Sequence, residues 1–588
     1  MEVDGRHLVA QWAYDTHAVL ARFHLWLEDV EVARAQPDEV SRHAFTPPGI
    51  TRSLAMTAAA TALGTRLFGH FGEGRGQDKV TYNQVKKAAD AVSAYATSEG
   101  LWHLTRALPE NHALMVSLGE GLMPKAGETP EMGANPLLGF GRVYARPEVA
   151  RIVDRAVRRL LNDRGWHFDD FRANLRQRGI TVWGAAVDTL ENTSRFAEGQ
   201  DIGPMSVLHV FDTPLRVTRP YEAYMGCLTV PRRVVAEAAE RSRLLDFRTP
   251  RADVLAMIEQ SYPGVARGNV HVWTLRGKSR QLRLGPLWDE WRALGVHLVE
   301  DGWRAPSGIP VFADSGTYAP TFLVGSWRAD DGATHVFLCD GYAASAEAMQ
   351  AASLAEVLDV DATMAPFSST FAGPIDEEDR LMRLAPEAPD FADRVAAITG
   401  ARPADDGRIA RLVESIHDAR AAEIPLGRRV LRADDLLPDK GWRVLAAIGY
   451  IGDDPYTGAP GVERLADDRY RVTTGLATRD ARSRVTFTVR LLDGLEGSRQ
   501  VWSPLLVRFL TGTDYQRLPA KISYSGRIRN ELQTMFSTAL DHDGDRIRVC
   551  FDRIDERVVP AAGKDALRRA LAWYREHHPT WFGWLELA

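Results

Sequence analysis

The strongest constraint on the fold is the pattern of residues 111–360, where short strand-like runs alternate with helical segments. The strand-like runs are ITVWGAAVD, MSVLHVFD, NVHVWTL, GVHLVED, IPVFAD and THVFLCD. Helical candidates between them include PEVARIVDRAVRRLLND, PRRVVAEAAERSRLL and LGPLWDEWRAL. Such alternation favours a mostly parallel sheet covered by helices. We therefore predict an α/β fold whose mostly parallel sheet core occupies about residues 111–360.

The segments on either side of this core have other patterns. Residues 1–110 carry apolar residues every three or four positions, which is typical of amphipathic helices. Residues 361–440 begin rich in proline and acid and are predicted to form a mostly helical connector. Residues 441–588 combine near-alternating runs, such as SRVTFTVRLLDG, with a last helix, which predicts an α+β domain. A chain of 588 residues is too long for one core, in keeping with this four-part division.

Composition and charge exclude several classes of protein. The chain is 45% hydrophobic and 26% charged, as ordinary soluble globular proteins are. A net charge of -6 argues against a nucleic-acid or anionic-membrane binder. No run approaches about 20 apolar residues, and the N-terminus lacks the apolar segment of a signal peptide. With Cys227, Cys339 and Cys550 far apart and outside any CxxC pair, we expect reduced thiols and a cytoplasmic location.

Several predicted strands end in an acidic residue. These acids are Asp188, Asp212, Glu300 with Asp301, Asp314 and Asp340. Ligands of open parallel α/β sheets bind beyond the carboxyl ends of the strands. If the strands are parallel, we expect these acids to gather at one edge of one sheet.

The acids have two alternative roles, as helix caps or as ligands. Asp188 and Asp212 are each followed by threonine and fit the N-cap alternative, whereas Asp301 and Asp314 are not followed by a helical pattern. For Asp340, which precedes an alanine-rich segment, cap, metal ligand and catalytic carboxylate all stay open. Crowded carboxylates repel one another unless a hard cation such as Mg²⁺ offsets their charge. We predict a Mg²⁺ site with ligands Glu300, Asp301, Asp314 and Asp340, the last also being catalytic.

Two basic loops supply the complementary charge. The loop TLRGKSRQ contains Arg276, Lys278 and Arg280, directly after the predicted strand NVHVW. The loop KISYSGRIRNE contains Lys521, Ser525, Arg527 and Arg529. Arginines beside a helix N-terminus bind anions, and the compact ammonium of a lysine can also move a proton. We predict that Lys278 and Lys521 are catalytic and that the arginines and Ser525 bind substrate; ordinary solvated surface charge is the alternative.

Other motifs fall short of a specific site. The glycines around Phe140 lack the third glycine of a dinucleotide fingerprint, DHDGDR lacks the last glutamate of a calcium loop, and no GxSxG elbow occurs. The basic loops are not Walker sequences. His271, His297 and His335 all lie in predicted strands, where each is either a proton carrier or a buried core histidine.

These features support two hypotheses. The first is a cytoplasmic enzyme that acts on a small anionic, phosphorylated metabolite with Mg²⁺ at the carboxyl edge of the sheet; phosphoryl transfer, ester hydrolysis and metal-assisted carbon chemistry all stay open. The alternative is a non-catalytic ligand-binding or assembly protein. Neither hypothesis involves nucleic acid or a membrane, and the oligomeric state stays open, a homo-oligomer included.

Overall fold

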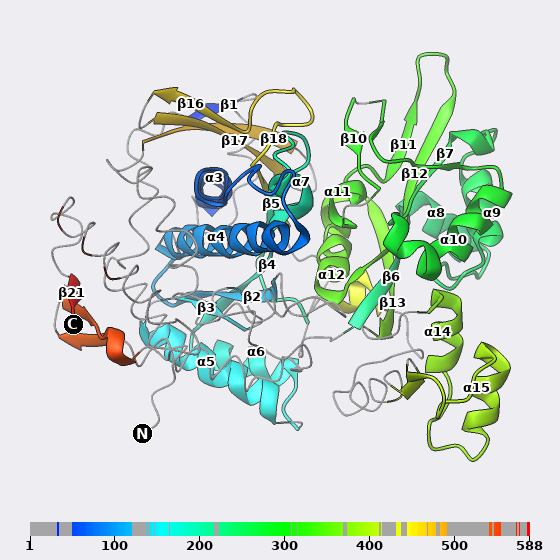
Figure 1. Ribbon diagram of the computed structural model, residues 1–588, viewed down its shortest axis with the longest axis horizontal. Helices are drawn as coiled ribbons and strands as arrows, with labels where there is room; N and C mark the ends of the chain where they lie inside the picture. Colours follow the sequence, from blue (N-terminus) through cyan, green and yellow to red (C-terminus); the bar gives the residue numbers. More distant parts are fainter. Residues whose placement is uncertain are drawn as a thin grey trace. The chain divides into compact units, whose positions relative to one another are not determined.

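The computed structural model divides the chain into two compact units, residues 1–220 with 438–588 (unit 1) and residues 221–437 (unit 2) (Figure 1). The structure describes residues 32–34, 50–119, 138, 141–216, 223–368, 373–410, 413, 431–436, 444–490, 540–553, 568, 572, 576 and 585–588. Gaps inside these ranges are 107, 146, 164, 307, 314–315, 408, 467–468, 478–481 and 544–545.

Unit 1 is built on a nine-stranded sheet. In sheet order its strands are β1 (Val32–Arg34), β18 (Arg482–Arg490), β17 (Arg469–Ala477), β15 (Val444–Tyr450), β5 (Met205–Phe211), β4 (Thr181–Glu191), β2 (His112–Gly119) and β3 (Val143–Tyr144), with β16 (Val462–Ala466) beside β17. The pairing of β5 with β15 joins the two distant segments of this unit. A separate three-stranded sheet contains β19 (Leu540–Asp543), β20 (Arg546–Val549) and β21 (Leu585–Leu587).

Helices cover both sides of the β2–β4 region in unit 1 (Figure 1). One layer is α3 (Ile50–Phe68) with α4 (Lys79–Arg106), and the other is α5 (Pro147–Asn162) with α6 (Phe168–Gln177). The small residues of α3 allow close contact with α4, since a Cβ added at Gly64 would lie 2.9 Å from the Cβ of Ala96. The helical spacing predicted for this part of the N-terminal region is confirmed, whereas Val32–Arg34, in another stretch predicted to be helical, forms β1 and pairs with β18. No helix in the described part of the chain is both long and apolar enough to span a membrane.

Unit 2 is built on a seven-stranded sheet. In sheet order its strands are β14 (Leu431–Arg432), β13 (Val360–Ser368), β6 (Ala223–Pro231), β12 (Thr334–Ala344), β7 (Val270–Trp273) and β8 (His297–Leu298), with β11 (Gly325–Arg328) beside β12. A short pair is formed by β9 (Trp303–Arg304) and β10 (Pro310–Val311).

The helices of unit 2 lie on both faces of this sheet (Figure 1). One face carries α8 (Arg232–Glu240), α9 (Arg251–Ser261) and α10 (Gln281–Ala293), and the other carries α11 (Tyr318–Thr321) and α12 (Ser345–Ser353). The remaining helices are α13 (Ala355–Leu358), α14 (Ile375–Met382) and α15 (Phe391–Thr399).

The sheets are mixed, so the prediction of one mostly parallel sheet is wrong. Among the described strand pairs, only β2–β4, β7–β12, β7–β8 and β20–β21 are parallel. The α/β class itself holds, because both units combine helices with sheets. The sequence pattern failed because not every helix between two strands is a crossover. Helix α7 (Thr193–Ala197), between β4 and β5, is too short to return the chain, and these strands pair antiparallel.

One glycine of β6 is required by an aromatic ring above it. A Cβ added at Gly226 would lie 2.2 to 2.5 Å from ring atoms of Phe247. The same ring packs edge-on against Phe367 of β13, with a centroid distance of 5.8 Å. Gly226 therefore provides the space in which Phe247 covers β6 and β13.

We expect Gly226→Ala to lower the free energy of unfolding by about 1–3 kcal/mol, because a methyl group cannot enter this space without moving the ring. Gly268→Ala is the control, since no atom lies within 4 Å of a Cβ at that position. Urea denaturation of both variants measures the difference. Equal stabilities for the two variants would contradict the packing argument.

Candidate functional site

Asp340 is the centre of a buried ion pair in unit 2. It lies inside β12, and its side chain is 0% exposed. Arg251, the first residue of α9, donates from Nε to Oδ2 at 2.9 Å and from Nη2 to Oδ1 at 3.0 Å. Trp291 of α10 donates from its indole Nε1 to Oδ2 at 2.7 Å. Both carboxylate oxygens are therefore occupied, and the pair links β12 to two helices.

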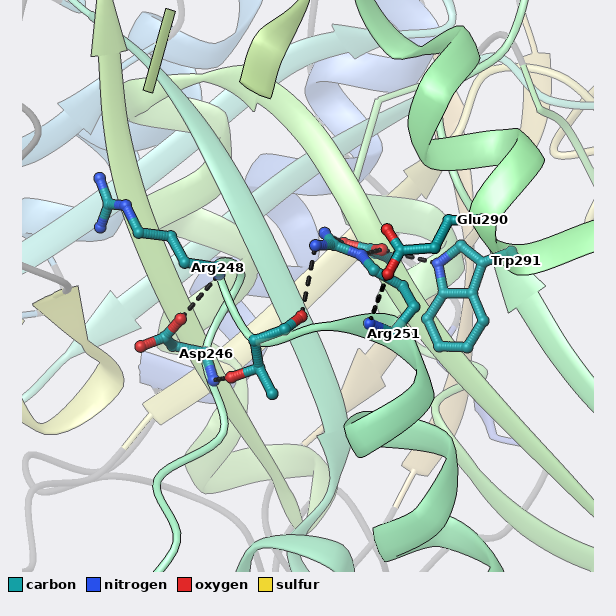
Figure 2. A network of polar contacts seen from close by, with 7 residues as sticks. Asp246, Arg248, Arg251, Glu290 and Trp291 are labelled. Carbon is teal, nitrogen blue, oxygen red and sulfur yellow. Dashed lines mark hydrogen bonds and ion pairs between the residues drawn. The ribbon is translucent and has the colours of Figure 1, made fainter. Parts of the chain in front are cut away.

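A second set of polar contacts holds Arg251 (Figure 2). Its backbone N–H donates to Oε1 of Glu290 at 2.8 Å, and its Nη1 donates to the carbonyl of Thr249 at 3.3 Å. The preceding turn is closed by Asp246, whose Oδ1 accepts from the backbone N–H of Arg248 at 2.7 Å. Burial opposes the charge of Arg251, but the charge and hydrogen bonds of Asp340 outweigh it, and the pKa of Arg251 is raised.

A second buried ion pair lies beside the first. Arg283 of α10 pairs with Glu378 of α14, donates from Nε to the hydroxyl of Tyr342 at 2.8 Å, and donates from Nη1 to the carbonyl of Gly373 at 3.0 Å. Burial again opposes the guanidinium charge, yet Tyr342 and Glu378 raise the pKa of Arg283 overall. Tyr342 is two residues after Asp340 on the same face of β12, so this strand anchors α9, α10 and α14 through adjacent positions.

The metal and catalytic roles predicted for Asp340 do not fit its surroundings. The strand continues to Ala344 and α12 begins at Ser345, so Asp340 is neither at the strand end nor a helix cap. Among the described residues, no group of three or more His, Cys, Asp or Glu side chains is placed to hold a metal ion. The structure therefore does not bring Asp340 together with Glu300 and Asp301 as a ligand set, and Asp314 lies outside the described residues.

The acids predicted to share one edge belong to different sheets. Asp188 lies inside β4 of unit 1, where its Oδ1 accepts from the backbone N–H of Leu190 at 3.2 Å, and Asp212 follows β5 of the same unit. Glu300 and Asp301 follow β8 of unit 2. The expected gathering of acids at one edge is wrong, because the strands that carry them do not form one parallel sheet.

The connections of unit 2 change direction between β7 and β12. These strands are adjacent and parallel, and β8 is parallel to β7 on the side away from β12. From β7 the chain passes through α10 to β8, whereas from β12 it passes through α12 and α13 across β6 to β13. The crossovers thus leave in opposite directions, with α10 and α12 on opposite faces (Figure 1). Such a switch point opens a crevice at the carboxyl ends of the two strands in open α/β sheets.

The first basic loop lies at this edge. Arg276 follows β7, and its backbone N–H donates to the carbonyl of Ala313 at 2.6 Å while Nη1 donates to the carbonyl of Val299 at 3.2 Å. These bonds attach the loop to the segments that follow β8 and β10. Lys278 is exposed and Arg280 is half-buried, and both lie in the short 3-10 turn that leads into α10. The three cations predicted together do lie on one short loop at the carboxyl end of β7.

One acid shares this loop region. Oδ1 of Asp301 accepts from the backbone N–H of Ala313 at 3.2 Å, so Asp301 and Arg276 contact the same residue. Glu300 is exposed beside it. The remaining predicted residues, Lys521, Ser525, Arg527 and Arg529, lie outside the described residues, so their closure over a ligand stays a prediction.

We expect Asp340→Asn to lower the free energy of unfolding by about 3 kcal/mol or more, because the substitution leaves the guanidinium of Arg251 buried without a counter-charge. Chemical denaturation at neutral pH measures this loss. Asp376→Asn is the control, because Asp376 forms an exposed pair with Arg380 at 3.7 Å, and such pairs contribute less than about 1 kcal/mol. If Asp340→Asn lowered the free energy of unfolding no more than the control does, the pair would not anchor the helices.

No protein-family model matches the chain, and no curated protein sequence matches it. Of the features described above, the two buried ion pairs are structural, whereas the loop that contains Lys278 presents charge to solvent at the switch point of the sheet.

Proposed function

We propose that unit 2 binds a small anionic ligand, a phosphorylated metabolite, at the carboxyl edge of β7 and β12. One observation carries the proposal: the crossovers from these adjacent parallel strands leave in opposite directions, and the cationic loop 276–280 follows one of them. Ligands of α/β sheets bind at such positions because the diverging connections leave room beyond the strand ends.

The physical chemistry of the loop favours an anion. Helix α10 has 13 residues, and the positive dipole end of its first turn lies directly after the cations. Lys278 offers an exposed ammonium, and Arg280 a guanidinium suited to two-point contact with phosphate. Arg276 has a different role, since its bonds to Val299 and Ala313 fix the shape of the loop.

Whether the bound ligand reacts depends on groups other than Asp340. The enzyme hypothesis retains Lys278 as the group that moves a proton. It also retains Mg²⁺, which commonly binds through one or two carboxylates together with substrate phosphates; Glu300 and Asp301 follow β8 at this edge. The engagement of Asp340 by Arg251 favours the second candidate, a non-catalytic ligand-binding protein that uses the same anion site. A cytoplasmic location belongs to both proposals.

We expect the double substitution Lys278→Ala and Arg280→Ala to weaken phosphate-ligand binding about tenfold or more, since each charge-assisted hydrogen bond contributes about 1.5–3 kcal/mol. Calorimetric titration with pyrophosphate and a sugar phosphate measures the affinity. Stability should change by less than about 0.5 kcal/mol, as for other surface substitutions. Arg394→Ala on α15 is the control, because Arg394 is exposed and pairs with Asp390 at 2.7 Å. Failure of the wild-type protein to bind either ligand would overturn the proposal.

We expect Mg²⁺ to bind weakly alone and more tightly when a phosphate ligand is present, because the described acids do not form a metal site by themselves. Glu300→Gln should reduce the increase in Mg²⁺ affinity that the phosphate ligand causes. It should leave phosphate binding in the absence of Mg²⁺ unchanged or slightly stronger. Titration of Mg²⁺ with and without saturating pyrophosphate, corrected for the complex that forms in solution, measures both effects. Equal Mg²⁺ affinity in the two conditions would remove the metal from the proposal.

A further inference from the structure

Three histidines form a hydrogen-bonded cluster on one face of the unit 2 sheet. They are His271 of β7, His297 of β8 and His335 of β12, here called the histidine cluster. His271 is opposite His297 in the parallel register, and its partner on the other side, Phe337, is two residues from His335 on the same face. Nδ1 of His271 lies 2.7 Å from Nδ1 of His297, and Nε2 of His271 lies 2.9 Å from Nδ1 of His335.

Two tryptophans cover the cluster. The rings of Trp303 and Trp327 stack on His271 at centroid distances of 4.8 and 5.4 Å, and Trp327 also stacks on His335 at 5.3 Å. His271 is left only 6% exposed. The central imidazole therefore has both nitrogens bonded to other imidazoles and little contact with water.

The two nitrogen-to-nitrogen contacts limit the number of protons that the closed cluster can hold. Each nitrogen-to-nitrogen contact holds one proton, because one ring donates and the other accepts. Three neutral rings carry three protons: two fill the contacts, and the third lies on the outer Nε2 of His297 or His335. One further proton fits on the other outer nitrogen. The next proton would place two N–H groups face to face in one contact, so it breaks the cluster.

The charged groups around the cluster do not offset a positive charge on its central ring, His271. Glu300, after β8, favours the charged form of His297 at the edge of the cluster. Arg304 of β9 and Arg328 of β11 are the strand neighbours of the two tryptophans, so their side chains point to the opposite faces. Arg267, before β7, is paired with Glu259 at 2.7 Å.

Asp301 and the β11–β12 turn complete these surroundings. Asp301 accepts a bond from the backbone N–H of Ala313, and Asp331 accepts one from the backbone N–H of Ala333. Asp330, also in this turn, is exposed to solvent. The acids are thus at the periphery, and in the described part of unit 2 only imidazoles bond to the nitrogens of His271.

The strands that the cluster connects are short. β8, β9 and β10 have two residues each, and β8 pairs with β7 through two register positions. Few backbone hydrogen bonds therefore hold residues 296–312 to the sheet, in contrast to the nine paired positions of β6 and β13. The contacts of His297 and Trp303 with His271 add to the bonds of Val299 with Val272 and of Phe312 with Trp273.

We propose that the histidine cluster is an acid-sensitive link that holds residues 296–312 on the unit 2 sheet at neutral pH and releases them on acidification. Release separates the three rings, and His271 and His297 then bind protons that the closed cluster excludes. Because the segment includes Val299, Glu300 and Asp301, release would also alter the carboxyl edge, but the link does not require that a ligand binds there.

The direction of the pH effect follows from proton linkage. Burial and the neighbouring histidines lower the pKa of His271 from 6.5 to about 3, and burial also lowers the pKa of His297. Between about pH 3 and pH 6.5 the released form therefore binds more protons than the closed form. If release takes up two protons, its equilibrium constant rises about 100-fold per pH unit below the ordinary histidine pKa.

Hydrogen–deuterium exchange of the full-length protein between pH 7 and pH 4.5 tests the link, with rates corrected for the intrinsic pH dependence. We expect peptides covering 296–312 to lose protection steeply as the pH falls, while peptides of β6 and β13 stay protected. His271→Gln removes the central titrating ring and keeps a donor and an acceptor, so protection of 296–312 should depend less steeply on pH, by about one proton.

His112→Gln is the control, because His112 in unit 1 is also partly buried with a lowered pKa but accepts from Trp183 at 3.0 Å rather than from a histidine. It should leave the exchange of 296–312 unchanged. If His271→Gln does not fold, His335→Gln serves instead and should reduce the pH slope, because it removes one of the two imidazole contacts of His271. Three results would each overturn the proposal. Protection of 296–312 in the wild type could be independent of pH, or the whole of unit 2 could lose protection at once. The third is an unchanged pH slope in the variant.

Discussion

The pairing of Arg251 with Asp340 is the interaction on which the arrangement of unit 2 depends. A carboxylate at the centre of a sheet is expensive to bury, and it is tolerated here because a two-point guanidinium contact and an indole N–H occupy both oxygens. Since the donors come from α9 and α10, neither helix can shift along the sheet without exposing an unpaired charge to an apolar interior. The pair thereby defines a position for each helix, which apolar packing alone specifies less strictly.

This constraint extends to the edge where we place the ligand site. Trp291 and Arg283 are both in α10, and they bond to Asp340 and Tyr342 in successive positions of one face of β12. With α10 held at two points, its first turn and the preceding loop have a defined position relative to the ends of β7 and β12. A rigid support of this kind is what a binding loop requires.

Sequence patterns predicted local structure better than pairing. Amphipathic spacing identified α3 and α4, and β-branched runs identified β4, β5, β7 and β12. The order of strands was out of reach, because β5 pairs with β15, which lies more than two hundred residues further along the chain. Asp340 was recognised as unusual, but its partner was not, since an arginine that follows a proline at the start of a helix has the same appearance whether it is exposed or buried. The histidines were noted separately, and only the register of β7, β8 and β12 shows that they meet.

The side chains of β12 alternate between two faces of different chemistry, and this restricts how the strand can pair. One face presents Asp340 and Tyr342 to arginines, and the other presents His335 and Phe337 to aromatic rings. A slip of one residue would exchange the two faces and leave the two guanidinium groups facing Gly341 and either Cys339 or Ala343, with no carboxylate or phenol to pair with. A slip of one residue is therefore penalised on both faces at once. The segment THVFLCDGYAA specifies its own alignment, which discourages wrong strand exchange during folding or between copies of the chain.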